Sequence, residues 1–103
     1  MKTYPKKRID IMVETPLMKR VISILDQHGV GGYTVLPVLA GKGKDGAWHR
    51  DGLVGRAGTL VMIFCIVDET RVSEVLGAVF TLVEKQIGIV TVSDVQVIRP
   101  EYF

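Results

Sequence analysis

The sequence predicts an α+β protein of the ferredoxin-like class, with a four-stranded antiparallel sheet that carries two helices on one face. Two observations support this prediction. Segments with alternating apolar residues and segments with apolar residues at helical spacing follow one another in the order βαββαβ. In addition, each half of the chain is a strand-helix-strand unit, which is the arrangement of the split βαβ motif.

In the first half, the segment Arg8–Glu14 alternates between apolar and charged residues and predicts a half-buried strand. Thr15 is a plausible N-cap for a helix that runs from about Pro16 to His28 and stops at Gly29. The alternation places three residues on one face of the strand: Ile9, Ile11 and Val13.

The next strand, Tyr33–Leu39, follows the glycine-rich turn Gly29–Gly32. Pro37 cannot donate a hydrogen bond to a neighbouring strand, so it predicts an edge strand or a bulge. The segment Ala40–Arg56 then shows no period and holds five glycines and four basic residues. We expect a long loop there, and long loops in small domains are usually functional.

In the second half, the strand Thr59–Val67 is apolar on both faces and therefore needs two covers, the helices on one side and a neighbouring subunit on the other. The second helix is expected from about Arg71 to Lys85, with Asp68 or Thr70 as its cap. The last strand is expected over Ile89–Ile98, with Ser93-Asp94 as a candidate bulge.

Composition narrows the functional classes. The 103 residues suit one domain over 1–103, and 48% hydrophobic residues exclude a disordered polar chain. A chain this short buries so much apolar surface most easily as an oligomer. The net charge of +2 is too small to indicate nucleic-acid binding. The single Cys65 and the apolar run Ala57–Val67, which is shorter than the ~20 residues of a membrane span, predict a cytoplasmic protein without membrane insertion.

The long loop carries the strongest functional signal. Its stretch Gly41–Lys44 combines glycines, which let backbone amides approach an anion, with lysines that neutralise phosphate. The same residues also fit a solvated hairpin tip. The turn Gly29–Gly32 follows a helix instead of preceding one, so a tight connection is favoured there. Arg99 could hold a phosphate or carboxylate, or it could pair with Glu101.

No constellation of residues indicates catalysis, and we expect no enzyme. His49 and Asp51 are candidate metal ligands, and His28 and Cys65 are the only other imidazole and the only thiol of the chain. They do not form a recognisable zinc spacing, so we expect no metal site.

The sequence resembles the PII-like signalling proteins. The matching segments are Gly29–Val35, Gly41–Lys44 and Asp94–Arg99, and together with the βαββαβ order they span nearly the whole chain. The resemblance implies a homotrimer whose T-loop is about residues 40–56, with adenine nucleotides bound in clefts between subunits. It implies the following nucleotide-binding residues: Gly31, Gly32 and Thr34 near the adenine, Gly41, Lys42, Gly43 and Lys44 at the phosphates, and Arg99 as the first arginine at the end of the last strand.

Three departures from the nitrogen-regulatory members matter. Their Gly-Asp-Gly-Lys phosphate loop is missing, because residues 84–89 read Glu-Lys-Gln-Ile-Gly-Ile. Glu101 replaces their second C-terminal arginine, and residues 40–56 contain no tyrosine for modification. A triphosphate would lose several contacts, so we expect ADP or AMP to bind at least as well as ATP.

The sequence looks more like the PII-like proteins associated with carboxysomes or bicarbonate transporters. That resemblance implies bicarbonate as a second ligand and a transporter or enzyme of carbon metabolism as protein partner. The bicarbonate site would use Gly41, Lys42, Gly43 or Arg56. The residues that face the partner would be Trp48, His49 and Arg50.

Two alternatives of related fold remain. A CutA-like trimeric metal-binding or metal-response protein would use His49, Asp51 and Cys65 as ligands. An acylphosphatase would need an asparagine beside its anion loop, and this sequence contains no asparagine.

Overall fold

The structure is a computed structural model of the chain, and it describes residues 1–44, 46–49, 59–86 and 88–103. Short 3-10 turns (η) precede both helices and follow the last strand. In chain order the elements are β1 (Tyr4–Glu14), η1 (Thr15–Leu17), α1 (Met18–Gln27), β2 (Thr34–Val38), β3 (Ala40–Gly43), β4 (Gly46–His49), β5 (Leu60–Val67), η3 (Glu69–Arg71), α2 (Val72–Val83), β6 (Gly88–Val97) and η4 (Pro100–Tyr102).

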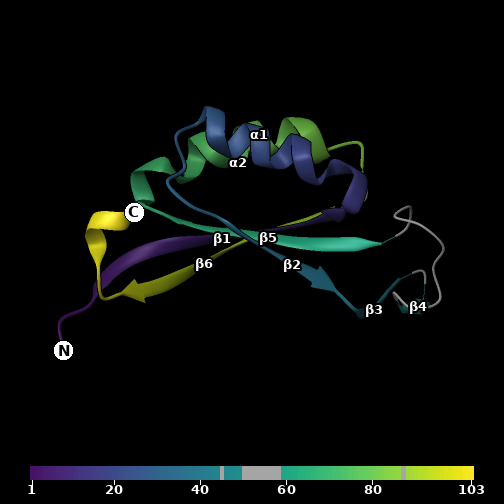
Figure 1. Cartoon of the computed structure of the whole chain (residues 1–103), viewed down its shortest axis with the longest axis horizontal. Coiled ribbons are helices and arrows are strands. Elements are labelled where there is room, and N and C mark those ends of the chain that lie inside the picture. Colours follow the sequence, from purple (N-terminus) through teal and green to yellow (C-terminus); the bar gives the residue numbers. More distant parts are fainter. Residues whose placement is uncertain (45, 50–58, 87) are drawn as a thin grey trace.

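The main sheet has four antiparallel strands in the order β2-β5-β1-β6. Both helices cover the same face of this sheet, and no described helix or strand covers the other face, which we call the open face (Figure 1). The predicted fold class is therefore confirmed. β2 pairs with β5 at one edge of the sheet, where Pro37 lies opposite Val61. The edge position that Pro37 predicted is confirmed as well.

The core lies between the sheet and the helices. On β5, every second side chain is buried under the helices, and the residues between them are partly exposed on the open face. β1 alternates in the same way over its second half. The residues with the most deeply buried side chains come from β1, α1, β5 and α2: Ile9, Ile11, Val13, Val21, Leu25, Ile63, Cys65, Val75 and Val79.

The segment after β2 is not simply the irregular loop that the sequence predicted. β3 and β4 form a two-stranded antiparallel sheet of their own, with Gly43 opposite Gly46. Gly46 has a φ of +104°, a backbone conformation that side chains disfavour, so a glycine there permits the tight turn. A search for long periodic segments misses this hairpin because each of its strands has only four residues.

Three local predictions were wrong. β1 begins at Tyr4 and not at Arg8, because β6 is long enough to pair with the basic stretch and Lys7 forms an ion pair with Asp94. The register between β1 and β6 is continuous, so there is no bulge at Ser93-Asp94. Thr15 does not cap a helix, because its hydroxyl lies 2.6 Å from the hydroxyl of Thr59 in a buried contact.

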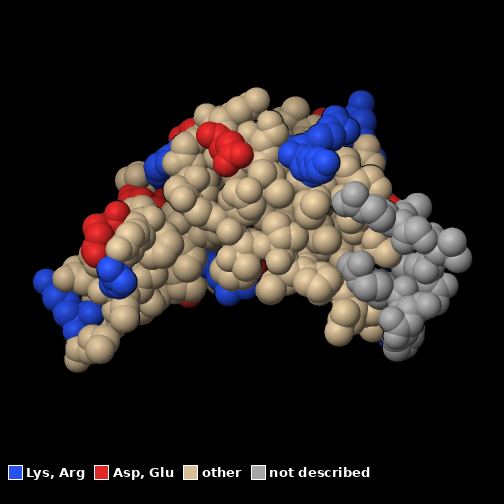
Figure 2. Space-filling view, viewed as in Figure 1, with Lys and Arg blue, Asp and Glu red and all other residues tan. Residues whose placement is uncertain are grey.

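Within the described ranges, no helix is both long and apolar enough to cross a membrane. On the face in Figure 2, lysines and arginines lie in separate groups interspersed with acidic residues, and do not form a single basic stripe.

We predict that Ile11→Ala costs about 2–5 kcal/mol of folding free energy, because Ile11 is fully buried on a central strand and its truncation leaves a cavity. Chemical denaturation measures the loss. Ile98→Ala is the matched control, since Ile98 is 58% exposed. Equal losses in the two variants would contradict this description of the core.

Candidate functional site

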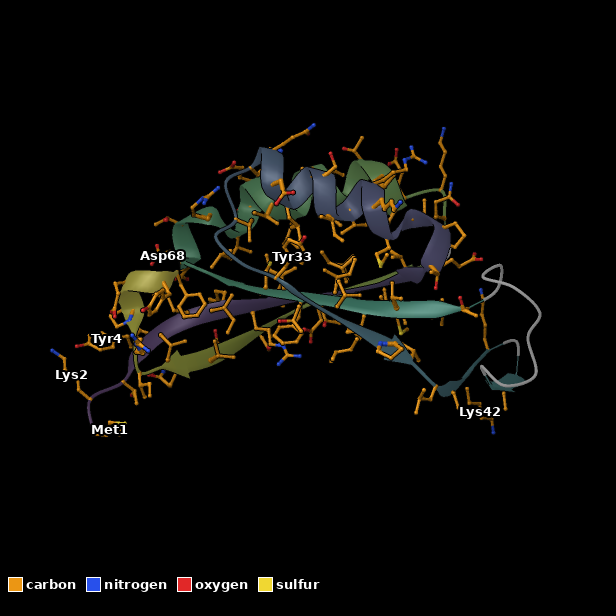
Figure 3. The ribbon with its side chains drawn as sticks, in the orientation of Figure 1. Met1, Lys2, Tyr4, Tyr33, Lys42 and Asp68 are labelled. Carbon is orange, nitrogen blue, oxygen red and sulfur yellow. The ribbon has the colours of Figure 1, made fainter. Side chains whose placement is uncertain are left out.

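The predicted binding residues fall into two groups at opposite ends of β2. Gly31 and Gly32 lie just before the strand and Thr34 is its first residue, whereas Gly41–Lys44 follow its end. At ~3.3 Å per residue, the five residues of β2 alone span about 16 Å of the path from Gly32 to Gly41. In Figure 3, Lys42 lies at one end of the molecule, whereas Tyr33, which stands between Gly32 and Thr34 in the sequence, lies near its middle.

The group after β2 is formed by the hairpin. Lys42, Gly43 and Lys44 are exposed, and Gly41 is half-buried. A Cβ atom built at Gly43 would meet no atom within 4 Å among the described residues, so packing within the protomer does not require glycine there. The exposed lysines and open backbone of this segment suit contact with an anion.

Part of the predicted loop lies outside the described residues. This applies to Arg50, Asp51 and Arg56. The backbone of Trp48 and His49 belongs to β4, but their side chains are not described. The roles of these five residues in partner, bicarbonate or metal binding therefore stay predictions.

The group before β2 begins where α1 ends. Gly29 adopts a φ of +68°, as expected of a glycine that terminates a helix. The guanidinium of Arg71 donates hydrogen bonds to the carbonyl oxygens of His28 and Gly29. A cation at the negative end of the α1 dipole stabilises this turn and fixes the path of the chain toward Gly32.

Arg71 and His28 are joined by a carboxylate on α2. Nδ1 of His28 lies 2.7 Å from Oε2 of Glu74, and Arg71 Nη2 is 3.5 Å from the same oxygen. The pKa of Glu74 is lowered, chiefly by the hydrogen bond with His28 and to a smaller extent by Arg71. This cluster ties the end of α1 to α2.

Arg99 lies at the same end of the molecule as Gly31. A Cβ atom at Gly31 would be 3.5 Å from the main-chain oxygen of Tyr102 in η4. Arg99 Nη2 donates to the Tyr102 hydroxyl at 2.7 Å, and Arg99 Nε lies 3.8 Å from Glu101 Oε1. The structure thus brings the main chain of Tyr102 next to Gly31, and the Arg99–Glu101 contact considered in the sequence analysis is present as a long, exposed ion pair.

Lys6 anchors this end of the molecule. Its ammonium group donates to Asp68 Oδ1 at 3.0 Å and to the main-chain oxygen of Phe103 at 3.4 Å. Asp68 also accepts hydrogen bonds from the backbone and hydroxyl of Thr70. It therefore caps η3, the 3-10 turn that leads into α2, whereas the N-cap of α2 itself, Arg71, makes no side-chain cap hydrogen bond. The Thr70 hydroxyl and then Lys6 lower the pKa of Asp68 to about 2.

The open face of the sheet carries a charged pair within an apolar surface. Arg8 Nε donates to Asp10 Oδ1 at 2.7 Å, and the guanidinium carbon lies 4.0 Å from the centre of the Phe64 ring. Leu36 and Ile89 on the same face are about half exposed. A surface of this kind is typical of a protein interface.

The metal-binding alternative gains little from the structure. Cys65 faces the helices on β5, and burial raises the pKa of its thiol to about 11, which disfavours the thiolate that binds metals. In the described part of the chain, no three His, Cys, Asp or Glu side chains are grouped to hold a metal ion.

Sequence reasoning missed Tyr102, Arg71 and Lys6 near the predicted site. For Tyr102, the sequence does contain a pattern that indicates its contact with Arg99. Side chains three residues apart lie on the same side of a 3-10 turn, so the spacing of Arg99 and Tyr102, with Pro100 between them, indicates their contact. The contacts of Lys6 and Arg71 join distant parts of the chain, and no local pattern indicates them.

These observations define a small split βαβ protein with glycine-rich, basic segments at the two ends of its sheet. The family model for the nitrogen regulatory protein P-II matches residues 6–102, so the chain belongs to this family. The resemblance drawn from the sequence is confirmed. No curated protein matches the chain.

Solved structures agree with this assignment. CPII from Thiomonas intermedia K12, a nitrogen regulatory PII-like protein bound to ADP, AMP and bicarbonate, is 34% identical with a TM-score of 0.88, and the match covers 99% of this chain and 96% of that one. A putative PII-like signalling protein from Thermus thermophilus is 26% identical with a TM-score of 0.80, over 98% and 97% of the two chains. A DUF3240 family protein from Shewanella baltica, at 9% identity, a TM-score of 0.67 and 89% coverage of both chains, shares the fold alone.

We predict that Asp68→Ala lowers stability at neutral pH and that this deficit fades as the pH falls. The pKa of Asp68 in the folded protein lies below its ordinary value of 3.8, so its contribution is complete above that value and disappears as the pH falls toward about 2. Denaturation midpoints at a series of pH values measure the effect.

Asp68→Asn is the control for this prediction. It keeps the side-chain oxygen that accepts from Thr70 but removes the charge that pairs with Lys6. We expect a smaller deficit at neutral pH than with alanine. A deficit of Asp68→Ala that stays constant across this pH range would show that the charge of Asp68 contributes nothing.

Proposed function

We propose that this protein is a non-enzymatic, trimeric PII-like regulator that binds adenine nucleotides between its subunits, with bicarbonate as a second ligand. The observation that carries the proposal is the 34% identity, over 99% of the chain, to a PII-like protein whose structure holds ADP, AMP and bicarbonate. The geometry of the described residues supports each part of the proposal in turn.

The trimer is supported by the open face of the sheet. β5 contributes Leu60, Met62, Phe64 and Ile66 to this face, and none of them is fully buried within the protomer. Packing this face against two further copies would remove the apolar area from water, a gain of about 25 cal/mol per Å². The Arg8–Asp10 pair would then fix how the copies are aligned.

Binding between subunits is supported by the separation of the two groups of residues. Gly41–Lys44 and the group of Gly31, Gly32 and Arg99 lie at opposite ends of β2. One small ligand could not contact both groups of the same protomer. A ring of copies would bring the hairpin of one subunit beside the Gly31 turn of the next, so that a nucleotide contacts both.

The preference for AMP and ADP follows from the number of cations available to the phosphates. Lys42, Lys44 and Arg99 are the candidates, whereas Glu101 adds a negative charge 3.8 Å from Arg99 Nε. Each additional phosphate therefore meets fewer donors and more repulsion. Bicarbonate would bind at the base of the T-loop, near Gly41, Lys42, Gly43 or Arg56.

The regulatory output would depend on the T-loop, about residues 40–56. Ligand binding at its base would favour one arrangement of the loop, and the partner would bind that arrangement through Trp48, His49 and Arg50. We further propose a cytoplasmic location and a transporter or enzyme of inorganic-carbon metabolism, including a carboxysome-linked one, as partner. The likeness to the bicarbonate-bound relative supports this assignment.

We predict that calorimetric titration detects AMP and ADP binding at least as tight as ATP binding, and that bicarbonate tightens it. Arg99→Ala should weaken AMP binding about tenfold or more, because a charge-assisted hydrogen bond to phosphate is lost. Lys19→Ala, which removes an exposed lysine of α1, is the matched control.

The outcomes of this titration are distinct. Absence of binding by any nucleotide would refute the proposal as a whole. Nucleotide binding that does not respond to bicarbonate would keep the nucleotide sensor but remove bicarbonate and the link to carbon metabolism. Unchanged affinity in Arg99→Ala would exclude Arg99 from the site.

We predict that Phe64→Lys converts the trimer to monomers, because it places a second cation beside Arg8 on the open face of the sheet. Sedimentation velocity measures the assembly state. Phe80→Lys is the matched control, since Phe80 is 61% exposed on α2 in the helix layer. Loss of the trimer in Phe80→Lys alone would place the interface on the helix layer instead.

A further inference from the structure

The Arg99 side chain is held in a defined position by Tyr102. Nη2 donates to the phenol oxygen at 2.7 Å, and the guanidinium carbon lies 4.7 Å from the centre of the ring. Arg99 is the N-cap of η4 and Pro100 its first residue, so the 3-10 turn places the two side chains on the same side. A hydrogen bond and a cation–π contact thus act on one guanidinium.

This contact leaves most of the guanidinium able to bind a ligand. Arginine carries five N–H donors, and the phenol oxygen accepts from Nη2. Nη1 has no hydrogen-bond partner within the described part of the chain, and the side chain is 64% exposed. A phosphate can therefore approach Nη1 and the outer edge of the group while the stacking on Tyr102 is kept.

η4 contacts the turn that precedes β2 through its main chain. The Tyr102 main-chain oxygen would lie 3.5 Å from a Cβ atom at Gly31. At Gly32 a Cβ atom would meet nothing within 4 Å among the described residues, so this side of the turn is open. The last strand and the turn thus contribute to one end of the molecule, where Lys6 also holds Phe103.

We propose that Tyr102 is a positioning residue for nucleotide binding, which holds the Arg99 guanidinium in the orientation that receives a nucleotide phosphate. This inference rests on the proposed function. An exposed arginine that is free to rotate loses conformational entropy when it binds, whereas a guanidinium already fixed on a ring has lost much of it beforehand. Tyr102 therefore raises affinity for phosphorylated nucleosides without contacting the nucleoside itself.

A purely structural role for Tyr102 is disfavoured by its exposure. Its side chain is 57% exposed and does not belong to the core. Removal of the hydroxyl oxygen leaves no buried cavity, and it leaves no polar group of the core without a partner. The variant Tyr102→Phe should therefore fold normally while it loses the hydrogen bond to Arg99.

The test compares AMP with adenosine by calorimetric titration of the full chain. We expect Tyr102→Phe to weaken AMP binding about three- to tenfold, the usual cost of immobilising a rotamer-rich side chain at the moment of binding, and to leave adenosine binding unchanged. Tyr4→Phe is the matched control, because Tyr4 contacts Lys2, 5.2 Å from its ring, and not Arg99. It should bind AMP as the unaltered protein does.

A double-mutant cycle with Arg99→Ala separates positioning from direct contact. If Tyr102 acts through Arg99, Tyr102→Phe causes no further loss of AMP affinity once Arg99 is alanine. Full additivity of the two losses, an equal loss for adenosine, or no loss for AMP would each overturn the inference and leave the proposed function intact. Failure of the unaltered protein to bind any adenine nucleotide would overturn both.

Discussion

The rest of the structure depends on β5, a central strand that is apolar on both faces. Its alternate residues Val61, Ile63, Cys65 and Val67 are buried under the two helices, which accounts for one face. The other face has no cover among the residues that the structure describes, and a chain of 103 residues has little surface to spare for one. The helices therefore complete the core of the protomer. The uncovered face of the sheet is the physical reason to expect an assembly with further copies of the chain.

The same sheet also determines where a ligand can bind. β2 is an edge strand, and the chain enters it from the Gly29–Gly32 turn and leaves it into the β3–β4 hairpin. Because strands are extended, the residues best suited to an anion are kept apart within a protomer. The assembly proposed above, built on the open face, would resolve both problems together, since it would cover β5 and place the ends of neighbouring chains near one another.

Much of the fold could be predicted from the sequence, wherever a short-range pattern of residues indicates an element. Short-range patterns predict three features that the structure confirms: the alternating burial along β5, the edge position of the strand that contains Pro37, and the end of the first helix at Gly29. The start of β1 was missed because Lys6 and Lys7 are polar, and only pairing with β6 draws them into the sheet. The roles of Lys6 and Arg71 depend on contacts between distant residues, which periodicity does not reveal.

The β3–β4 hairpin is the part of this fold best suited to respond to a ligand. It forms a separate two-stranded sheet, and such a hairpin is only marginally stable in water. For two of its eight paired residues, Gly43 and Gly46, a Cβ atom would meet no atom of the described residues within 4 Å, so these glycines add no packing against that part of the chain. An anion bound at Gly41–Lys44, as proposed above, would therefore need to supply only a few kcal/mol to change the arrangement of this hairpin. A stable four-stranded sheet could not respond in this way, because the same binding energy would be small beside that of its packed core.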